Sequence, residues 1–282
     1  MKKTILSAVA MLAAATGAVA QNLISSGSPL YKLPYKNTYV MQTLVAENTF
    51  RTAKVEKTHP GTFEQARKVL PSPYWEGHDK EIEMYWKAWK IGIGNICQPK
   101  DDSGFVTSYI APAYNGNIFM WDDAFITMFC RYGKNFFPFQ KTLDNFYAKQ
   151  HPDGFICREI RADGSDCFGR YDPTSTGPNL MPWSEWLYYT QFGDDNRLNR
   201  VFPRRVRARD RLDKPCPVLA ACSEWVKLNH TWRNGTYWSS GWGTGMDNMP
   251  RVQEQYNTIY SHGHMIWLDA CLQQIMVAKI LL

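Results

Sequence analysis

The chain has 282 residues, of which 44% are hydrophobic and 21% are charged. These proportions are ordinary for a folded protein, so they exclude a disordered chain, a collagen and a coiled coil, and the length predicts one or two domains. The formal net charge is +6, and about +4 remains without Lys2 and Lys3, so the charge balance is mild.

The first twenty residues have the pattern of a bacterial secretory signal peptide. Lys2 and Lys3 precede an apolar stretch from Ile5 to Ala15, and the small-residue site Ala18-Val19-Ala20 follows. The stretch is shorter than the roughly 20 residues that a membrane helix needs. We therefore expect cleavage after Ala20, a periplasmic or secreted protein, and no membrane insertion after cleavage.

Cysteine and histidine spacing indicates no metal site. The seven cysteines are odd in number and lack CxxC spacing, so neither a zinc site nor a complete disulfide framework is predicted. A Cys157–Cys167 pairing stays open, although most cysteines fit small buried apolar positions better. His262 and His264 are two residues apart, a poor spacing for shared helical ligands, and no calcium-loop pattern occurs. We expect neither metal nor cofactor.

Helical periodicity dominates the chain. Residues 21–60 lack a clear period and are predicted to form an extended lead-in to a domain over 61–282. Thr62 and Gln65 have capping-box spacing. Apolar residues at steps of three and four, with start or stop signals, predict helices over 62–70, 79–91, 121–132, 138–149, 182–192, 218–228 and 261–282. Strand alternation is nearly absent, so the fold class is predicted to be all-α.

A basic run between Arg204 and Lys214 contains five arginines and one lysine. Asp210 and Asp213 interrupt the run and no aromatic residue is interleaved, so a solvated surface is favoured over a nucleic-acid site. Residues 197–203 are echoed by residues 211–217, which indicates a local insertion or duplication. We expect no nucleic-acid partner.

Residues 237–251 hold the densest group of candidate site residues. Their glycines let the backbone approach a ligand, and Asp247 is flanked by Asn248, Arg251 and Trp242. An aspartate among apolar rings loses hydration, which raises its pKa and suits it to general-acid catalysis. Aromatic rings stack on the flat C–H faces of sugars. A glycine-rich turn capped by the aspartate is the alternative, and composition leaves both open.

Three further clusters of similar composition lie in loops or at helix starts: Asn117–Phe125, Gln150–Ile156 and Pro178–Trp186. In the first, Asp122 or Asp123 either caps the helix or holds sugar hydroxyls. In the second, an ordinary Pro-Asp-Gly turn is the alternative. Four clusters of one kind form a pattern that a purely structural helical repeat would not need.

These clusters resemble glycoside hydrolase family 63 and its bacterial relatives, the mannosylglycerate hydrolase-like glycosidases, and more distantly the trehalases. The resemblance covers about residues 60–282, and its last motif is the most specific. In chain order the matching motifs are Phe119-x-Trp121-Asp122-x-Ala124-Phe125, Gln150-x-x-Asp153-Gly154, Pro182-Trp183 at a helix start, and Gly245-Met246-Asp247-Asn248-x-Pro250-Arg251.

The resemblance implies an (α/α)6 toroid of six helical hairpins that hydrolyses α-linked glycosides with inversion. Asp247 matches the proton donor, and helices 121–132, 182–192 and 261–282 would start around one funnel. The inverting geometry implies a second carboxylate, the base for water, roughly 6.5–9.5 Å from the donor. The sugar pocket would be lined by Trp121, Asp122, Gln150, Asp153, Trp183, Trp242, Asn248 and Arg251.

The chain departs from the family after Asp247, because no motif for the base follows it. Only Glu254 and Asp269 are acidic there, and neither lies in a motif of the family, so the base is expected to be missing; Glu254 would be the first candidate only if this chain hydrolysed glycosides robustly. With about seven predicted helices instead of twelve, the expectation is an incomplete toroid, about half to two-thirds of the barrel, with little or no hydrolase activity alone. Such a piece would expose apolar helix faces.

A non-catalytic or degenerate glycan-binding protein is the alternative function. It would keep the aromatic pocket and bind saccharides without turnover. In both cases the expected partner is an oligosaccharide or α-glycoside, and the sequence does not fix the sugar, the linkage or the oligomeric state.

Overall fold

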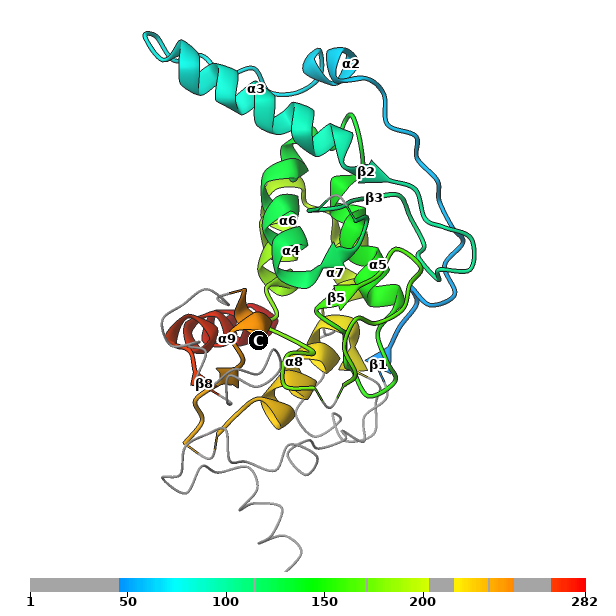
Figure 1. Ribbon diagram of the computed structural model, residues 1–282, viewed down its shortest axis with the longest axis vertical. Helices are drawn as coiled ribbons and strands as arrows, with labels where there is room; N and C mark the ends of the chain where they lie inside the picture. The colour runs from blue at the N-terminus through cyan, green and yellow to red at the C-terminus, as the bar shows by residue number, and fades with distance from the viewer. Residues whose placement is uncertain (1–45, 114, 171, 203–215, 233, 246–264) are drawn as a thin grey trace, which may run out of the picture.

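The structure is a computed structural model that describes residues 46–113, 115–170, 172–202, 216–232, 234–245 and 265–282. These residues are mostly helical, which confirms the predicted helical class (Figure 1). The helices are α2 (Phe63–Arg67), α3 (Asp79–Gly94), α4 (Met120–Cys130), α5 (Thr142–Ala148), α6 (Met181–Phe192), α7 (Asp195–Val201), α8 (Val218–Asn229) and α9 (Leu268–Leu281).

Strands in the described residues are only two residues long and form four two-stranded sheets. β1 (Ala46–Glu47) pairs in parallel with β6 (Cys216–Pro217), and the other three pairs are antiparallel. These are β2 (Ile96–Cys97) with β3 (Tyr109–Ile110), β4 (Ile118–Phe119) with β5 (Glu159–Ile160), and β7 (Trp238–Ser239) with β8 (Met265–Ile266).

Local signals set several helix ends as predicted. The hydroxyl of Thr62 accepts a hydrogen bond from the backbone N–H of Gln65, and the Gln65 side chain accepts one from the backbone N–H of Thr62, which is the predicted capping box. Helix α6 has Pro182 in its first turn and ends at Gly193, whose φ of +63° is a conformation that glycine adopts without a Cβ clash.

Other boundaries differ from the prediction. The helix predicted over 62–70 ends at Arg67, and the one over 138–149 starts as a 3₁₀ turn at Phe139–Lys141 before α5. The helix predicted from residue 261 starts at Leu268 in the described residues, because β8 pairs with β7 just before it. Residues 1–45, with the signal peptide and most of the lead-in, lie outside the described residues, as do 203–215.

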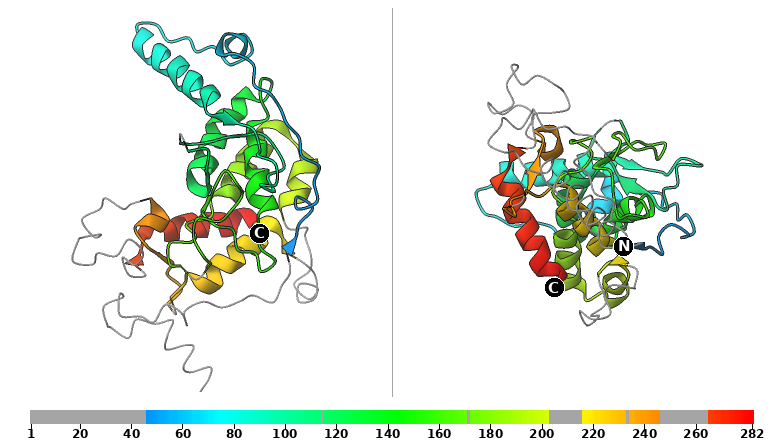
Figure 2. Two further views of the ribbon diagram at one scale, coloured as in Figure 1. Left: turned by 45° about the vertical axis from the view of Figure 1, so that its right-hand side comes forward. Right: turned by 90° about the horizontal axis from the view of Figure 1, so that it is seen from below.

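Two apolar clusters form the core. The larger lies between α5, α8 and the loop before β5, and the smaller packs α3 against α4 and the 3₁₀ turn at Phe139–Lys141. Helix α3 projects at one end of the molecule, while α4 and α6 lie in the middle and α9 packs against α6 and α8 (Figures 1 and 2). Large fully buried side chains include Trp89, Tyr147, Phe146, Phe155 and Trp225.

Six cysteines are free thiols in the structure, and Cys157 and Cys167 are therefore not joined by a disulfide; the six are Cys97, Cys130, Cys157, Cys167, Cys222 and Cys271. Burial raises the pKa of Cys157 to about 11 and that of Cys167 to about 12, so both stay protonated at neutral pH. No described helix combines the length and the apolar character that crossing a bilayer requires.

A buried ion cluster ties three helices together. Arg197 on α7 donates from Nε and Nη2 to the Glu185 carboxylate on α6, both at 2.7 Å, and its Nη2 lies 2.9 Å from Asp144 on α5. Tyr147 also donates to Glu185 at 2.8 Å. Burial raises the pKa of Asp144, although Arg197 opposes that rise. Each charge therefore has a partner inside the protein.

His230, at the end of α8, gives the fold a pH-dependent stability. Its ring is 2% exposed and stacks on Trp238 at 4.2 Å, and burial lowers its pKa to about 4. The unfolded state, with a pKa near 6.5, binds the proton first, so we expect stability to be full above about pH 6.5 and to fall by about 3 kcal/mol toward pH 4.

Urea unfolding at pH 7, 5 and 4 measures this effect. The variant His230→Gln is expected to lose stability at pH 7 but to show a smaller decrease on acidification than the wild type, because it has no imidazole to protonate. Equal decreases in the two proteins would contradict the assignment to His230.

Candidate functional site

Three aromatic side chains, two from the first half of α4 and one from the beginning of α6, form a row, called here the aromatic row. The rings of Trp121 and Phe125 lie 6.1 Å apart, and Phe125 lies 6.1 Å from Trp183 in an edge-on arrangement. Trp121 and Trp183 are half-buried, while Phe125 is exposed. The two tryptophans that the sequence assigned to one pocket are therefore joined through Phe125.

The two helices are held side by side by small polar residues. The hydroxyls of Thr127 on α4 and Ser184 on α6 are hydrogen-bonded at 2.8 Å, and both are fully buried. Gln140 donates to the same Ser184 hydroxyl at 3.3 Å. Small side chains at this contact let the helices approach closely, which positions Trp121 and Trp183 on neighbouring helix starts.

A glycine-containing turn, Trp242–Gly245, reaches the aromatic row. Gly245 has φ +69°, and a Cβ added there would lie 3.4 Å from the Trp121 ring. Trp242 is half-buried at the start of this turn. The backbone of the turn therefore lies against Trp121, two residues before Asp247.

The same turn packs on the segment that leads into α6. A Cβ added to Gly177 would overlap the carbonyl oxygen of Gly243, and one added to Gly243 would lie 3.0 Å from the Thr176 carbonyl oxygen. Real Cβ atoms do not approach backbone so closely. Residues 174–178 and 241–245 are thus in backbone contact, which brings two of the predicted clusters together.

The two aspartates at the start of α4 have different environments. Asp123 is fully buried, and its Oδ2 accepts a hydrogen bond from the backbone N–H of Phe119 at 2.9 Å. Burial raises its pKa well above the usual range. Asp122 keeps access to solvent, and partial desolvation raises its pKa while the nearby Arg158 opposes the rise. Neither aspartate caps the first turn of α4: Asp123 binds the backbone N–H of Phe119 just before the helix, and Asp122 is accessible to solvent.

Buried polar atoms in these segments that have no hydrogen-bond partner among the described residues include Oδ1 of Asp123 and three others. The three others are Nε1 of Trp121, Oδ1 of Asn179 and Oγ of Ser239. Leaving a buried polar atom unpaired costs about 1–3 kcal/mol. Trp121 belongs to the aromatic row, Asn179 precedes α6, and Ser239 lies beside Gly243. A polar ligand is one way to satisfy such atoms.

The side chains of Gln150 and Asp153, which the sequence assigned to the same pocket as Trp121, are hydrogen-bonded elsewhere in the protein. The Gln150 Nε2 donates to the carbonyl oxygens of Gly154 at 3.1 Å and Val218 at 2.8 Å. Asp153 Oδ2 accepts from Trp225 Nε1 at 3.2 Å. Both side chains are buried, and these bonds connect the Pro-Asp-Gly turn to α8. No described hydrogen bond or ring contact joins either side chain to the aromatic row.

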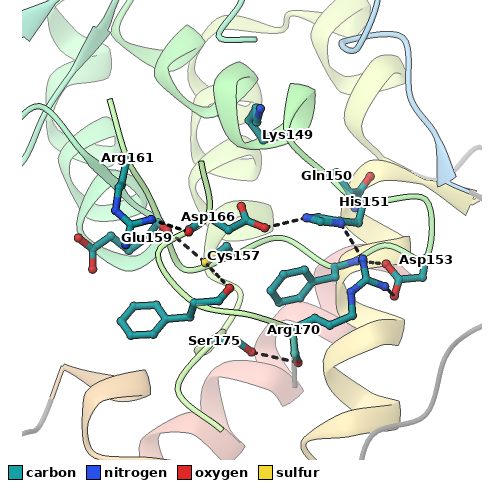
Figure 3. A network of polar contacts seen from close by, with 12 residues as sticks. Lys149, Gln150, His151, Asp153, Cys157, Glu159, Arg161, Asp166, Arg170 and Ser175 are labelled. Atoms are coloured by element: carbon teal, nitrogen blue, oxygen red, sulfur yellow. Dashed lines mark hydrogen bonds and ion pairs between the residues drawn. The ribbon is translucent and has the colours of Figure 1, made fainter. Parts of the chain in front are cut away.

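A charged network that the sequence did not reveal surrounds this turn (Figure 3). Arg170 lies 2.5 Å from Asp153 and 2.6 Å from Nδ1 of His151, whose Nε2 lies 2.7 Å from Asp166. Arginine only donates, so we assign Nδ1 as the acceptor and Nε2–H as the donor. The sequence shows that loop 150–172 is rich in charged residues, but it does not show which of them pair. The network braces the loop before α6.

Asp247, Asn248 and Arg251 lie outside the described residues, as does Glu254. Within the part of the chain that the structure describes, no group of three or more His, Cys, Asp or Glu side chains is arranged to hold a metal ion. No family model, curated protein or solved structure matches this chain.

Proposed function

We propose that the protein binds an α-linked saccharide at the aromatic row, beside the Trp242–Gly245 turn. The observation that carries the proposal is the half-buried Trp121, whose ring contacts Gly245 while its buried Nε1 has no partner among the described residues. A sugar offers a flat C–H face for the ring and hydroxyls for the N–H. Asp122 adds an accessible carboxylate at the same helix start.

The chemistry proposed for this site is inverting hydrolysis of α-glycosides, with Asp247 as general acid. Asp247 follows Gly245 by two residues, so the contact between Gly245 and Trp121 supports its placement near the saccharide. In the proposed architecture, α4 and α6 are neighbouring inner helices of a six-hairpin toroid. Their side-by-side packing and the aromatic residues at their starts support that architecture.

Saccharide binding without hydrolysis is the second candidate. One observation favours it: the amide nitrogen of Gln150 and the carboxylate of Asp153, both assigned to the sugar pocket by the resemblance, bond within the protein. A pocket in which Gln150 and Asp153 do not contact the sugar would bind it mainly through the aromatic row.

The test compares Trp121→Ala with Trp75→Ala. Trp75 is 56% exposed and stacks on His78 ahead of α3, so it controls for loss of a surface indole. Calorimetric titration with α-linked disaccharides is expected to give roughly tenfold weaker binding for Trp121→Ala and no change for Trp75→Ala, because removing the ring loses stacking of about 0.5–1.5 kcal/mol together with its apolar contact area. No binding by the wild type, or equal binding by both variants, would refute the site.

Turnover is measured with aryl α-glycosides in parallel. Little release is expected from the wild type, and Asp247→Asn is expected to remove whatever release occurs while leaving disaccharide binding in place. Unchanged turnover in Asp247→Asn would exclude this residue as the acid, and binding with no turnover in either protein would favour the second candidate.

A further inference from the structure

A hollow of about 400 Å³ lies beside the end of α5, where three segments of the chain meet, and it is called here the α5 hollow. Arg51 comes from the segment after β1, residues 148–152 span the end of α5, and Gly164 and Asp166 come from the loop before α6. None of these residues belongs to the aromatic row. Hollows of this size hold small organic ligands.

Packing of the N-terminal segment fixes Arg51 at one wall of the α5 hollow. Phe50 is 1% exposed, and its ring lies 5.1 Å from that of Tyr147 on α5. The next residue, Arg51, donates from Nε at 3.0 Å and also from Nη2 to the carbonyl oxygen of Gln150. These bonds leave the Nη1 amino group of Arg51 without a partner among the described residues. The solvent-exposed guanidinium can therefore bind a ligand without giving up its anchor.

Backbone contacts fix Lys149 at a second wall. Lys149 directly follows α5, and its Nζ donates to the carbonyl oxygen of Ser103 at 3.1 Å. The same Nζ packs over Gly104, where an added Cβ would lie 3.2 Å away. Gly164 presses on the Ser103 carbonyl, because a Cβ added to Gly164 would overlap that oxygen. The ammonium group is thus positioned in advance, which lowers the entropy cost of binding.

The charges around the α5 hollow favour an anion. Neither Arg51 nor Lys149 forms an ion pair with a carboxylate in the part of the chain that the structure describes. Among the described lining residues the acid is Asp166, which lies 2.7 Å from Nε2 of His151 (Figure 3). In the tautomer assigned above, the His151 ring carries no charge. Two cations against one carboxylate leave a formal charge of +1 on the lining.

We propose that the α5 hollow binds a small molecule through a dianionic oxyanion group held between Arg51 and Lys149. A phosphate monoester or a dicarboxylate supplies such a group. The unpaired N–H groups of Arg51 match its oxygens in direction, and Lys149 adds a compact positive charge. The rest of the hollow receives the uncharged part of the molecule. The proposal uses contacts other than those of the aromatic row, so it does not rest on saccharide binding there.

Calorimetric titration of the full chain tests the site, at neutral pH and low ionic strength in a buffer without polyanions. The probes are inorganic phosphate, glycerol 3-phosphate and malonate. Arg51→Gln and Lys149→Gln are each expected to weaken binding of the best probe about tenfold, because each removes a charge-assisted hydrogen bond. Lys87→Gln removes the same charge from an exposed residue of α3 and is expected to leave binding unchanged.

Asp166→Asn tests the sign of the effect. The wild-type carboxylate repels an anion in the α5 hollow, whereas an asparagine oxygen still accepts the hydrogen bond from Nε2 of His151. This variant is expected to bind the best probe about threefold more tightly than the wild type, because a like charge has been removed. A general structural disturbance would weaken binding instead, so the direction of the change separates the two effects.

The order of the probes identifies the anionic group. Tighter binding of glycerol 3-phosphate than of malonate assigns a phosphate monoester, and the reverse order assigns a dicarboxylate. Urea unfolding of each variant shows whether a loss of binding reflects a loss of the fold. If one of the two glutamine variants unfolds, the other and Asp166→Asn still decide the question.

Three outcomes would overturn the proposal. The first is no binding of any of the three probes to the wild type. The second is equal weakening by Lys87→Gln and by the variants of Arg51 and Lys149, which would show a response to overall charge. The third is weaker binding by folded Asp166→Asn than by the wild type.

Discussion

Gly177→Ala is expected to weaken saccharide binding about a hundredfold. A Cβ at this position would overlap the carbonyl oxygen of Gly243, which is backbone and cannot move away as a flexible side chain does. Residues 174–178 and 241–245 would have to separate, and the turn would withdraw Gly245 from Trp121. A displacement of about 1 Å can slow a catalysed reaction roughly a hundredfold, and we expect a loss of the same order in saccharide affinity.

Gly169→Ala is the matched control for this prediction. Gly169 lies in the same loop, its φ is not in the left-handed region, and a Cβ added there would meet nothing within 4 Å. Titration with the disaccharide that binds the wild type is expected to give unchanged affinity for Gly169→Ala. Thermal unfolding distinguishes a local change from general loss of the fold, because overpacking at Gly177 is expected to cost about 1–3 kcal/mol. Wild-type affinity in Gly177→Ala would show that the contact between these segments does not shape the site.

The second large effect is expected at the buried ion cluster. Arg197→Met leaves the carboxylates of Asp144 and Glu185 buried without their cation, and breaking a buried pair in this way costs about 3–5 kcal/mol. Urea unfolding at pH 7 measures the loss. The deficit is expected to shrink as the pH falls, because burial raises the pKa of Asp144 and its protonation removes one unpaired charge.

An exposed ion pair provides the comparison. Lys57 and Asp101 lie 3.1 Å apart with side chains 45% and 92% exposed. Lys57→Met is expected to change the free energy of unfolding by less than about 1 kcal/mol, since water already solvates both charges. If Arg197→Met and Lys57→Met had equal effects, the cluster between α5, α6 and α7 would contribute no more than a surface pair.

Local sequence signals predicted most helices because their causes are local. Thr62 and Gln65 are three residues apart, and Gly193 acts within one turn of α6. Helix α7 was missed because only Val201 among its seven residues is buried, so the helix has no apolar period. The start of α9 was placed too early because β7, far back in the sequence, pairs with β8.

For the candidate site, the sequence predicted that Trp121 and Trp183 would lie near each other, while the pocket itself stays a prediction. The composition around Trp121 and Trp183 indicated a shared pocket, and Phe125 joins them. The use of Asp153 was not predictable, because its partners Arg170 and Trp225 lie 17 and 72 residues away. The type of a residue indicates which groups its side chain can bind, but only the fold determines which of those groups lies next to it.

The parallel pairing of β1 with β6 has a consequence for how the chain is made. Ala46 pairs with Cys216, about 170 residues later in the chain. At roughly 5–20 residues per second, a ribosome needs on the order of 10–30 s to synthesise the intervening segment. Phe50, four residues after Ala46, packs at 5.1 Å against Tyr147, which emerges earlier. The N-terminal segment can therefore dock in two stages, first at Phe50 against α5 and last at β1, once β6 has left the ribosome.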